Sequence, residues 1–305
     1  MGSGLADHLS ISDRVSQALK AGQAVVALES TLIAHGLPWP ENLKTAFLME
    51  DMVRREGAEP AVIALENGAV RVGLSEDELR QLADAGYAKA GTRDLAGVLA
   101  RREKAATTVA STIYLAHLAG ISVTATGGIG GVHRDAWETG DVSGDLQELA
   151  RTPVTVVCSG AKSILDLPKT LEMLETLGVP VVGYRTNEFP GFYSSETGLP
   201  VPQRADSPED VAALVSAARS LELPSAVLVV QPPPHEDALD ASQVEAWTQE
   251  ALSAARSRGV RGKDVTPYLL RHIQDSGGKQ VLRANRSLAA SNARLAAQIA
   301  SALKS

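Results

Sequence analysis

The residues with the greatest capacity for chemistry lie between positions 124 and 162. An apolar run typical of a strand leads into four clustered glycines, whose backbone can adopt positive φ and come close to a ligand. His133 and Arg134 follow directly. An acidic patch begins at Asp141, and Lys162 comes after a second apolar run. Two strand ends therefore present functional groups and one lysine, at the kind of position where α/β proteins bind ligands.

Lys162 is a candidate nucleophile. An unperturbed lysine side chain has a pKa near ~10.4, so a nucleophilic lysine needs burial or a nearby cation. The apolar residues 154–158 supply a buried approach, and Ser159 and Ser163 carry hydroxyls able to orient an amine. Without further context, Lys162 is read as a solvated lysine at the start of a helix.

Two glutamates are candidate proton donors, because each ends an Ala-Leu-Glu run typical of a strand. Glu29 is followed by Ser30 and Thr31 and then His35, which predicts a position among other polar groups. Most glutamates are instead solvated or ion-paired. Glu66 leads into an Asn-Gly pair, a strong hairpin signal that explains its surroundings. The pattern alone does not decide between the two.

Asp141 is a candidate metal ligand. It is followed two and four residues later by Ser143 and Asp145, in a loop where a carboxylate oxygen and waters could hold a hard divalent cation. The alternative is an acidic loop in which Asp145 caps a helix that begins at Leu146.

Lys89 and Arg93 are candidate anion-binding residues. They lie in a short glycine-containing loop before a helix that Thr92 is expected to cap. Cations four residues apart usually form a solvated face, but beside a helix N-terminus they also suit a phosphate. Thr108 and Val109 are expected to pack at the start of a buried helix.

Two common nucleotide-binding motifs are excluded. The glycine cluster does not fit G-x-G-x-x-G, because His133 stands where the third glycine belongs. The segment around Lys162 lacks the Gly-Lys pair of a phosphate-binding Walker loop.

Composition narrows the class of protein. The chain has 305 residues, 44% of them hydrophobic, which is enough for one large core. The net charge of -7 argues against a basic nucleic-acid surface. The single cysteine, Cys158, excludes an internal disulfide and fits a reducing compartment. The N-terminal residues carry no apolar signal segment, and no run is long enough to span a bilayer, so a cytoplasmic location is expected.

Helix and strand patterns alternate along the chain, which predicts one α/β domain over residues 1–305 with a mostly parallel central sheet flanked by helices. Residues 1–11 are expected to form a flexible tail. Strands are expected over residues 24–29, 61–66, 70–72, 121–126, 154–158, 179–184 and 226–230. Helices are expected over residues 12–21, 41–55, 75–85, 107–119, 207–221, 241–258, 266–276 and 281–302, with another that reaches residue 177 and is interrupted at Pro168.

Two further segments have more than one interpretation. Asn285 and Asn292 lie seven residues apart on the last helix, hence on one face, which either meets solvent or points into the site. Residues 186–202 are rich in aromatic, proline and glycine positions, and could fold over the site or form a subunit contact.

The chain resembles the pseudouridine-5'-phosphate glycosidases, a family also called indigoidine synthase A-like. The resemblance runs from about residue 12 to the C-terminus, in one order with short gaps. Its blocks are Ala27-Leu28-Glu29-Ser30-Thr31, His35-Gly36, Pro40-Glu41-Asn42, Ala88-Lys89, Arg93-Asp94-Leu95, Thr107-Thr108-Val109-Ala110 and residues 126–133, 141–145 and 156–166.

The resemblance implies reversible cleavage of the C–C glycosidic bond of pseudouridine 5'-phosphate to uracil and ribose 5-phosphate. A carbon leaving group has no lone pair to protonate, so two carboxylates alone serve poorly. By resemblance, Lys162 attacks the sugar carbon C1' to form an imine-type adduct, and Glu29 protonates the uracil carbon. Asp141 would bind one Mn²⁺ per subunit, and the subunits would form homotrimers. The residues implied to contact substrate are Lys89, Val109, His133, Ser143, Gly144, Asp145 and Asn285.

Two other functions remain compatible with the residues. A Schiff-base enzyme such as an aldolase acting on a sugar phosphate would use the same lysine but release no base. A non-catalytic protein could bind a nucleotide or sugar phosphate at the same loops.

Overall fold

The computed structural model describes residues 8–84, 86–260 and 265–304. Its centre is an 11-stranded sheet with the main order β1-β4-β3-β2-β7-β8-β11-β9-β10, while β6 joins β3 and β5 joins β6. The β3–β4 and β3–β6 pairs are antiparallel, and the other pairs are parallel. The predicted fold class, α/β with a mostly parallel central sheet flanked by helices, is confirmed.

The strands are short and their central members are wholly buried, as expected of parallel strands covered on both faces. They are β1 (Leu9–Ile11), β2 (Val25–Leu28), β3 (Glu59–Glu66), β4 (Ala69–Val72), β5 (Ala88–Ala90), β6 (Ala105–Thr107), β7 (Val123–Ala125), β8 (Thr155–Cys158), β9 (Val181–Tyr184), β10 (Gln203–Ala205) and β11 (Val227–Val230).

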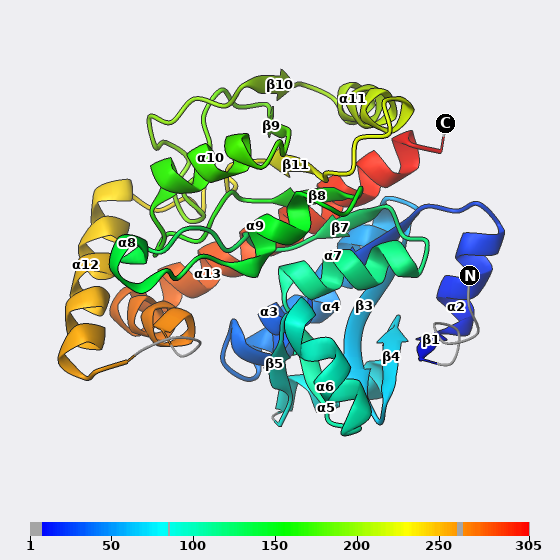
Figure 1. The fold of residues 1–305 in the computed structure, drawn as a ribbon, viewed down its shortest axis with the longest axis horizontal. Coiled ribbons are helices and arrows are strands. Elements are labelled where there is room, and N and C mark those ends of the chain that lie inside the picture. The colour runs from blue at the N-terminus through cyan, green and yellow to red at the C-terminus, as the bar shows by residue number, and fades with distance from the viewer. Residues whose placement is uncertain (1–7, 85, 261–264, 305) are drawn as a thin grey trace.

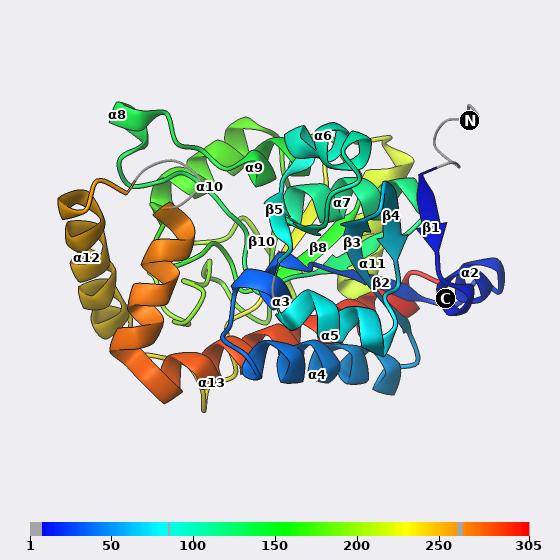
Figure 2. The same ribbon diagram turned by 90° about the horizontal axis from the view of Figure 1, so that it is seen from below.

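Helices lie on both sides of the sheet (Figures 1 and 2). They are α2 (Asp13–Lys20), α3 (Thr31–His35), α4 (Glu41–Arg55), α5 (Glu76–Asp84), η1 (Thr92–Asp94), α6 (Leu95–Ala100), α7 (Val109–Leu118), α8 (Ala136–Thr139), α9 (Gly144–Leu149), α10 (Leu167–Thr176), α11 (Pro208–Ser220), α12 (Ala241–Ser257) and α13 (Val265–Ala302). In Figure 2, α4, α5 and the C-terminal part of α13 lie on one side of the strands, and α6, α7 and α9 on the other. None of the helices in the described residues is long and apolar enough to cross a membrane.

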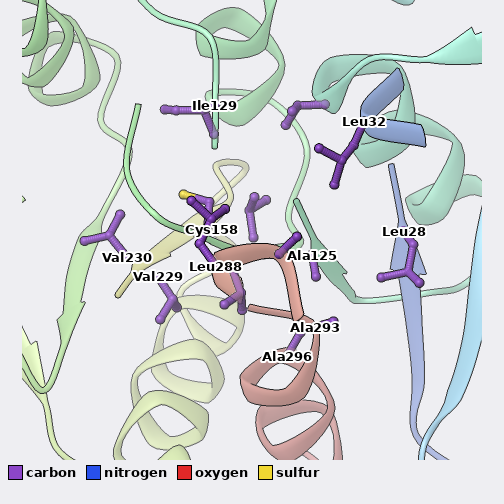
Figure 3. Packing of buried hydrophobic residues seen from close by; sticks show 14 of the residues in the cluster. Leu28, Leu32, Ala125, Ile129, Cys158, Val229, Val230, Leu288, Ala293 and Ala296 are labelled. Atoms are coloured by element: carbon purple, nitrogen blue, oxygen red, sulfur yellow. The ribbon is translucent and has the colours of Figure 1, made fainter. Parts of the chain in front are cut away.

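The C-terminal part of α13 is a central element of the core. Its Leu288, Ala293 and Ala296 are fully buried, and they gather with strand residues such as Ala125 and Val229 in Figure 3. Alanines on this face let the helix approach the strands closely, where dense packing contributes most to stability. At Gly278 the backbone leaves helical geometry (φ 53°, ψ -130°), so α13 is two helices joined at a kink.

Local signals in the sequence account for several connections. The turn between β3 and β4 has positive φ at Asn67 (56°) and Gly68 (82°), as a tight hairpin requires. Ser75 and Glu78 form the expected capping box, with the Ser75 N–H donating to Glu78 Oε2 at 2.7 Å. Both predictions are confirmed.

Other local predictions are corrected. Leu9–Ile11 form β1, paired in parallel with β4, so the flexible tail does not extend over these residues, and residues 1–7 lie outside the described part of the chain. Thr92 begins η1 and caps no helix; its hydroxyl instead donates to Glu148 Oε2 at 3.1 Å. Pro168 lies in the first turn of α10, where it is tolerated, and does not interrupt a longer helix.

The loop over residues 186–202 packs inside its own chain. Phe189, Phe192 and Tyr193 are 0%, 3% and 2% exposed. Phe192 and Tyr193 meet edge to face with ring centroids 4.6 Å apart. These rings are therefore core residues of this chain, and their side chains are not available for a subunit contact.

Candidate functional site

Three neighbouring strands converge at one edge of the sheet. Strands β2, β7 and β8 are adjacent and parallel, so their carboxyl ends meet there. Glu29 follows β2, Thr126 follows β7, and Lys162 lies four residues beyond β8. The two predicted catalytic residues therefore belong to one strand edge although they are far apart in sequence.

Glu29 is a buried carboxyl group held by a neighbouring hydroxyl. It is 5% exposed, and Thr126 Oγ1 donates a hydrogen bond to its Oε2. Burial raises the pKa of Glu29 above its ordinary value, while the positive charges of Lys162 and Lys89 and the Thr126 hydrogen bond act in the opposite direction. A carboxyl group that remains protonated above its usual range is suited to donate a proton.

A network of hydroxyl groups fixes the backbone around Glu29. Ser30 Oγ accepts from the Thr107 N–H at 2.7 Å, and Thr31 Oγ1 donates to the Thr107 carbonyl at 2.6 Å. Thr112 Oγ1 donates to Thr107 Oγ1 at 2.8 Å. These bonds connect the end of β2 to the end of β6, so Glu29 is carried by a rigid corner.

Lys162 is half-buried on a tightly held backbone. Its N–H donates to the Ile129 carbonyl at 3.1 Å, and its own carbonyl accepts from the Leu165 N–H at 3.0 Å. Gly160 precedes it at φ 75°, and a Cβ there would lie 2.0 Å from the Pro190 carbonyl oxygen, so only glycine fits. The backbone that presents the amine is therefore anchored on both sides.

Lys89, on β5, lies close enough to Lys162 and Glu29 for their charges to affect its pKa. It is solvent-accessible, yet the surrounding protein removes enough water to lower its pKa, and the charge of Lys162 lowers it further. Asp145, Glu29 and Asp141 raise it. By contrast, the Arg93 side chain is 85% exposed beside Asp94, which is the solvated arrangement.

His35 also lies near Lys89, although the sequence indicated only that it follows shortly after Glu29. Its pKa is lowered by burial and by the charge of Lys89. An imidazole that is neutral near pH 7 can accept as well as donate a hydrogen bond there.

Asp145 connects the glycine cluster to α7. Its carboxylate accepts from the Gly130 N–H at 2.8 Å and from the Ala110 N–H at 2.9 Å. A Cβ at Gly130 would lie 2.9 Å from Asp145 Oδ2, so the glycine permits this approach. Ser143 is the residue that caps α9, with its Oγ accepting from the Asp145 N–H at 3.2 Å. The expectation that Asp145 caps this helix is therefore wrong.

Val109 and Gly144, two residues predicted to contact substrate, have no side chain available to a ligand. The Val109 side chain is 2% exposed at the start of α7, behind the cap formed by Thr108, as the packing interpretation expected. Gly144, the first residue of α9, has open space where a Cβ would lie. Any contact that either residue makes with a ligand must use backbone atoms.

Asn285 and Asn292 face the protein interior, so the solvent-facing interpretation is wrong. Asn292 is fully buried, donates to the Thr126 carbonyl at 2.8 Å and accepts from Gln231 Nε2 at 2.8 Å. Asn285 is 6% exposed, and its Nδ2 donates to the Tyr193 hydroxyl at 3.4 Å. Its Oδ1 is buried and has no hydrogen-bond partner within the described residues. Asn292 thus supports the strand edge, and Asn285 retains an unused acceptor.

His133 and Asp141 form the remaining part of the group. His133 Nε2 lies 3.8 Å from Asp141 Oδ2, and burial lowers the pKa of the imidazole while the charge of Asp141 raises it. No three His, Cys, Asp or Glu side chains gather into a metal-ligand set within the described residues. One carboxylate fits a hydrated hard cation held mainly by water, and does not fit a closed protein cage.

Comparison with known proteins adds independent evidence on the family to which this chain belongs. The model of the family described as indigoidine synthase A like protein matches residues 14–302. A pseudouridine-5'-phosphate glycosidase of Symbiobacterium thermophilum is 51% identical and spans 97% of this chain and 98% of its own. One from Staphylococcus aureus is 46% identical, with 98% of each chain covered.

Solved structures agree with this fold. The prealnumycin C-glycosynthase AlnA, in complex with ribulose 5-phosphate, has a TM-score of 0.90 and 41% identity, with 97% of each chain covered. An indigoidine synthase A-like protein of Thermotoga maritima has a TM-score of 0.89 and 37% identity, covering 98% of this chain and 97% of that one. With the strand edge that carries Glu29 and Lys162, these matches establish that the chain belongs to the indigoidine synthase A-like family.

Proposed function

We propose that this enzyme, a pseudouridine-5'-phosphate glycosidase, works through a covalent adduct on Lys162, with Glu29 as the proton donor. One observation carries the proposal: Glu29 and Lys162 follow two parallel strands, β2 and β8, whose carboxyl ends lie at one edge of the sheet on either side of β7. An amine and a carboxyl group at one strand edge can act on adjacent atoms of one substrate.

The steps follow from the bond to be broken. The Lys162 amine forms a bond to C1' while the bond from C1' to the ring oxygen breaks, and that oxygen takes up a proton. Glu29 then protonates the uracil carbon as the C1'–C5 electron pair moves onto the base and the nitrogen lone pair forms an imine. Water hydrolyses the imine, which releases ribose 5-phosphate and the free amine.

Substrate binding is proposed for the residues around this pair. Lys89 and His133 supply cationic or donor groups, the segment Ser143-Gly144-Asp145 and Val109 supply backbone, and Asn285 supplies the unused acceptor. The ribulose 5-phosphate bound to AlnA supports a sugar phosphate as the ligand type.

Release of uracil tests this function against the two alternatives. Purified enzyme given pseudouridine 5'-phosphate is expected to release uracil, followed by ultraviolet absorbance. An aldolase-like enzyme would form an imine without releasing a base, and a binding protein would show neither reaction. Absence of uracil release in the presence of manganese would contradict the proposal.

The pH dependence should reveal Glu29. The pKa of this group is raised and the donor must be protonated, so kcat/KM is expected to fall on the alkaline side above the usual carboxyl range. Thr126→Val removes a hydrogen bond that favours the ionised form, so the pKa rises and the alkaline limb moves to higher pH. Thr126→Ser keeps the hydroxyl and serves as control. A limb that moves to lower pH in Thr126→Val would contradict the assignment.

A divalent cation is proposed at Asp141. Mn²⁺ bound to this carboxylate through one oxygen and waters would supply positive charge beside an anionic substrate. Exhaustive chelation is expected to abolish most uracil release, and added Mn²⁺ to restore it. Asp141→Asn should weaken the binding of Mn²⁺ measured by electron paramagnetic resonance. Full activity of the chelated enzyme would refute the metal requirement.

A homotrimer is proposed on family resemblance alone, because the aromatic loop is buried within its own chain. Light scattering at micromolar concentration is expected to give three times the chain mass of 31.9 kDa. A mass of one chain under these conditions would overturn the proposal. A cytoplasmic location is proposed on the single, buried Cys158.

A further inference from the structure

Arg134 connects three parts of the protein that meet beside Lys162. Its two terminal nitrogens bind both carboxylate oxygens of Glu245 on α12, with Nη1 to Oε1 at 2.6 Å and Nη2 to Oε2 at 2.8 Å. Nη2 also donates to the Ser163 carbonyl at 3.1 Å. The Arg134 side chain is 21% exposed and its bond to the Ser163 carbonyl is part-buried, whereas its bonds to Glu245 are exposed. The residue directly after Lys162 is therefore held by an arginine whose orientation is set from α12.

The backbone of Lys162 has three anchors, and Arg134 is the one made by a side chain. The other two are the Lys162 N–H to the Ile129 carbonyl and the Leu165 N–H to the Lys162 carbonyl. They hold the N–H and the carbonyl of Lys162, while the carbonyl of the next residue, Ser163, is held by Arg134. The bond to the Ser163 carbonyl depends on Arg134, which is oriented by its ion pair with Glu245. Substituting the Arg134 side chain removes this bond without altering the backbone.

We propose that Arg134 is a positioning residue for Lys162, acting through the backbone carbonyl of Ser163. The proposal rests on the role of Lys162 set out above. Loss of the bond leaves the Ser163 carbonyl without its donor, so the backbone directly after Lys162 is held less firmly and the Lys162 amine is less well placed against C1'. Since small displacements of a reacting group are costly, the rate of adduct formation falls while substrate binding stays nearly constant.

A second ion pair provides a matched control. Arg256 on α12 binds Asp135, the next residue along the chain, with Nη2 to Oδ1 at 2.6 Å. It joins the same helix to the same turn. The Arg256 side chain is 66% exposed, and within the described residues it forms hydrogen bonds with Asp135. Arg256→Gln should therefore leave the rate of adduct formation unchanged.

The first experiment measures the rate at which ribose 5-phosphate forms an adduct that borohydride can trap on Lys162. Arg134→Gln is expected to lower this rate and kcat by roughly 10- to 100-fold with little change in KM. If the wild-type enzyme traps no sugar phosphate at Lys162, the role of Lys162 fails and the proposal with it. If the wild type is labelled and Arg134→Gln reacts at the wild-type rate, the positioning proposal alone is overturned.

A charge exchange separates positioning from simple stabilisation. The double variant Arg134→Glu with Glu245→Arg restores an ion pair between the turn and α12, but a carboxylate at position 134 has no proton to donate to the Ser163 carbonyl. Its thermal midpoint is expected to return toward the wild-type value while adduct formation stays slow. Recovery of the wild-type rate would show that the ion pair merely holds the fold together, and would refute the proposal. This variant also carries the test if Arg134→Gln fails to fold.

Discussion

Replacing Lys162 with alanine is expected to reduce uracil release by roughly a thousandfold or more, which is the scale seen when a covalent nucleophile is removed. The reason is that Lys162 is the group we propose to form the bond to C1'. It sits on a backbone anchored by Ile129 and Leu165, so little of this loss should come from altered folding. Steady-state kinetics with pseudouridine 5'-phosphate, supported by a thermal unfolding curve, measure the effect.

Lys162→Arg separates the charge of the residue from its nucleophilicity. Arginine keeps a positive charge close to the Glu29 carboxyl, but its guanidinium does not lose a proton in proteins. We expect this variant to be as inactive as Lys162→Ala. Substantial activity in Lys162→Arg alone would mean that the lysine acts only as a charge, and substantial activity in Lys162→Ala would exclude Lys162 as the nucleophile. A comparable loss in Lys89→Ala accompanied by loss of labelling would move the nucleophile to Lys89.

Replacing Glu29 with glutamine is expected to lower uracil release by about 10²- to 10⁴-fold, the usual contribution of a positioned general acid. Glutamine has nearly the same shape and removes only the acidic proton. The imine with ribose 5-phosphate should still form, because that step needs Lys162 but does not need a proton donated to the uracil carbon. Uracil release and borohydride labelling, measured on the same preparation, therefore respond differently.

Glu66→Gln is the matched control, since both glutamates end an Ala-Leu-Glu strand. Glu66 lies at the β3–β4 turn, where its Oε1 is 2.5 Å from Lys104 Nζ. Its replacement should leave uracil release unchanged. Equal losses in the two variants would contradict the choice of Glu29 as proton donor.

The central strands and the hairpin could be predicted because their signals are local. The apolar runs of residues 24–29 and 154–158 became the buried strands β2 and β8, and the Asn-Gly pair became the turn after Glu66. The choice between Glu29 and Glu66 as proton donor could not be made from local sequence. It depends on strand order, which places the end of β2 beside the ends of β7 and β8 and leaves Glu66 at a turn.

Two of the corrected interpretations have a physical origin in tertiary packing. Asparagine is unfavourable inside a helix, so solvent was one of two interpretations for Asn292, yet the carbonyl of Thr126 and the amide of Gln231 satisfy its side chain in the core. Aromatic rings such as those of Phe192 and Tyr193 are typical of subunit interfaces, but these two pack in the core of their own chain. No sequence period could show that Arg134 reaches both Glu245 and Ser163, because this contact spans 111 residues to the first of them.

The covalent role of Lys162 can be measured directly by trapping the adduct. Enzyme is incubated with ribose 5-phosphate, reduced with borohydride, digested, and mapped by mass spectrometry. We predict the mass of the reduced sugar phosphate on the peptide that contains Lys162, and none on that peptide from Lys162→Arg. Labelling of the peptide that contains Lys89 instead, or no labelling by an enzyme that releases uracil, would contradict the account.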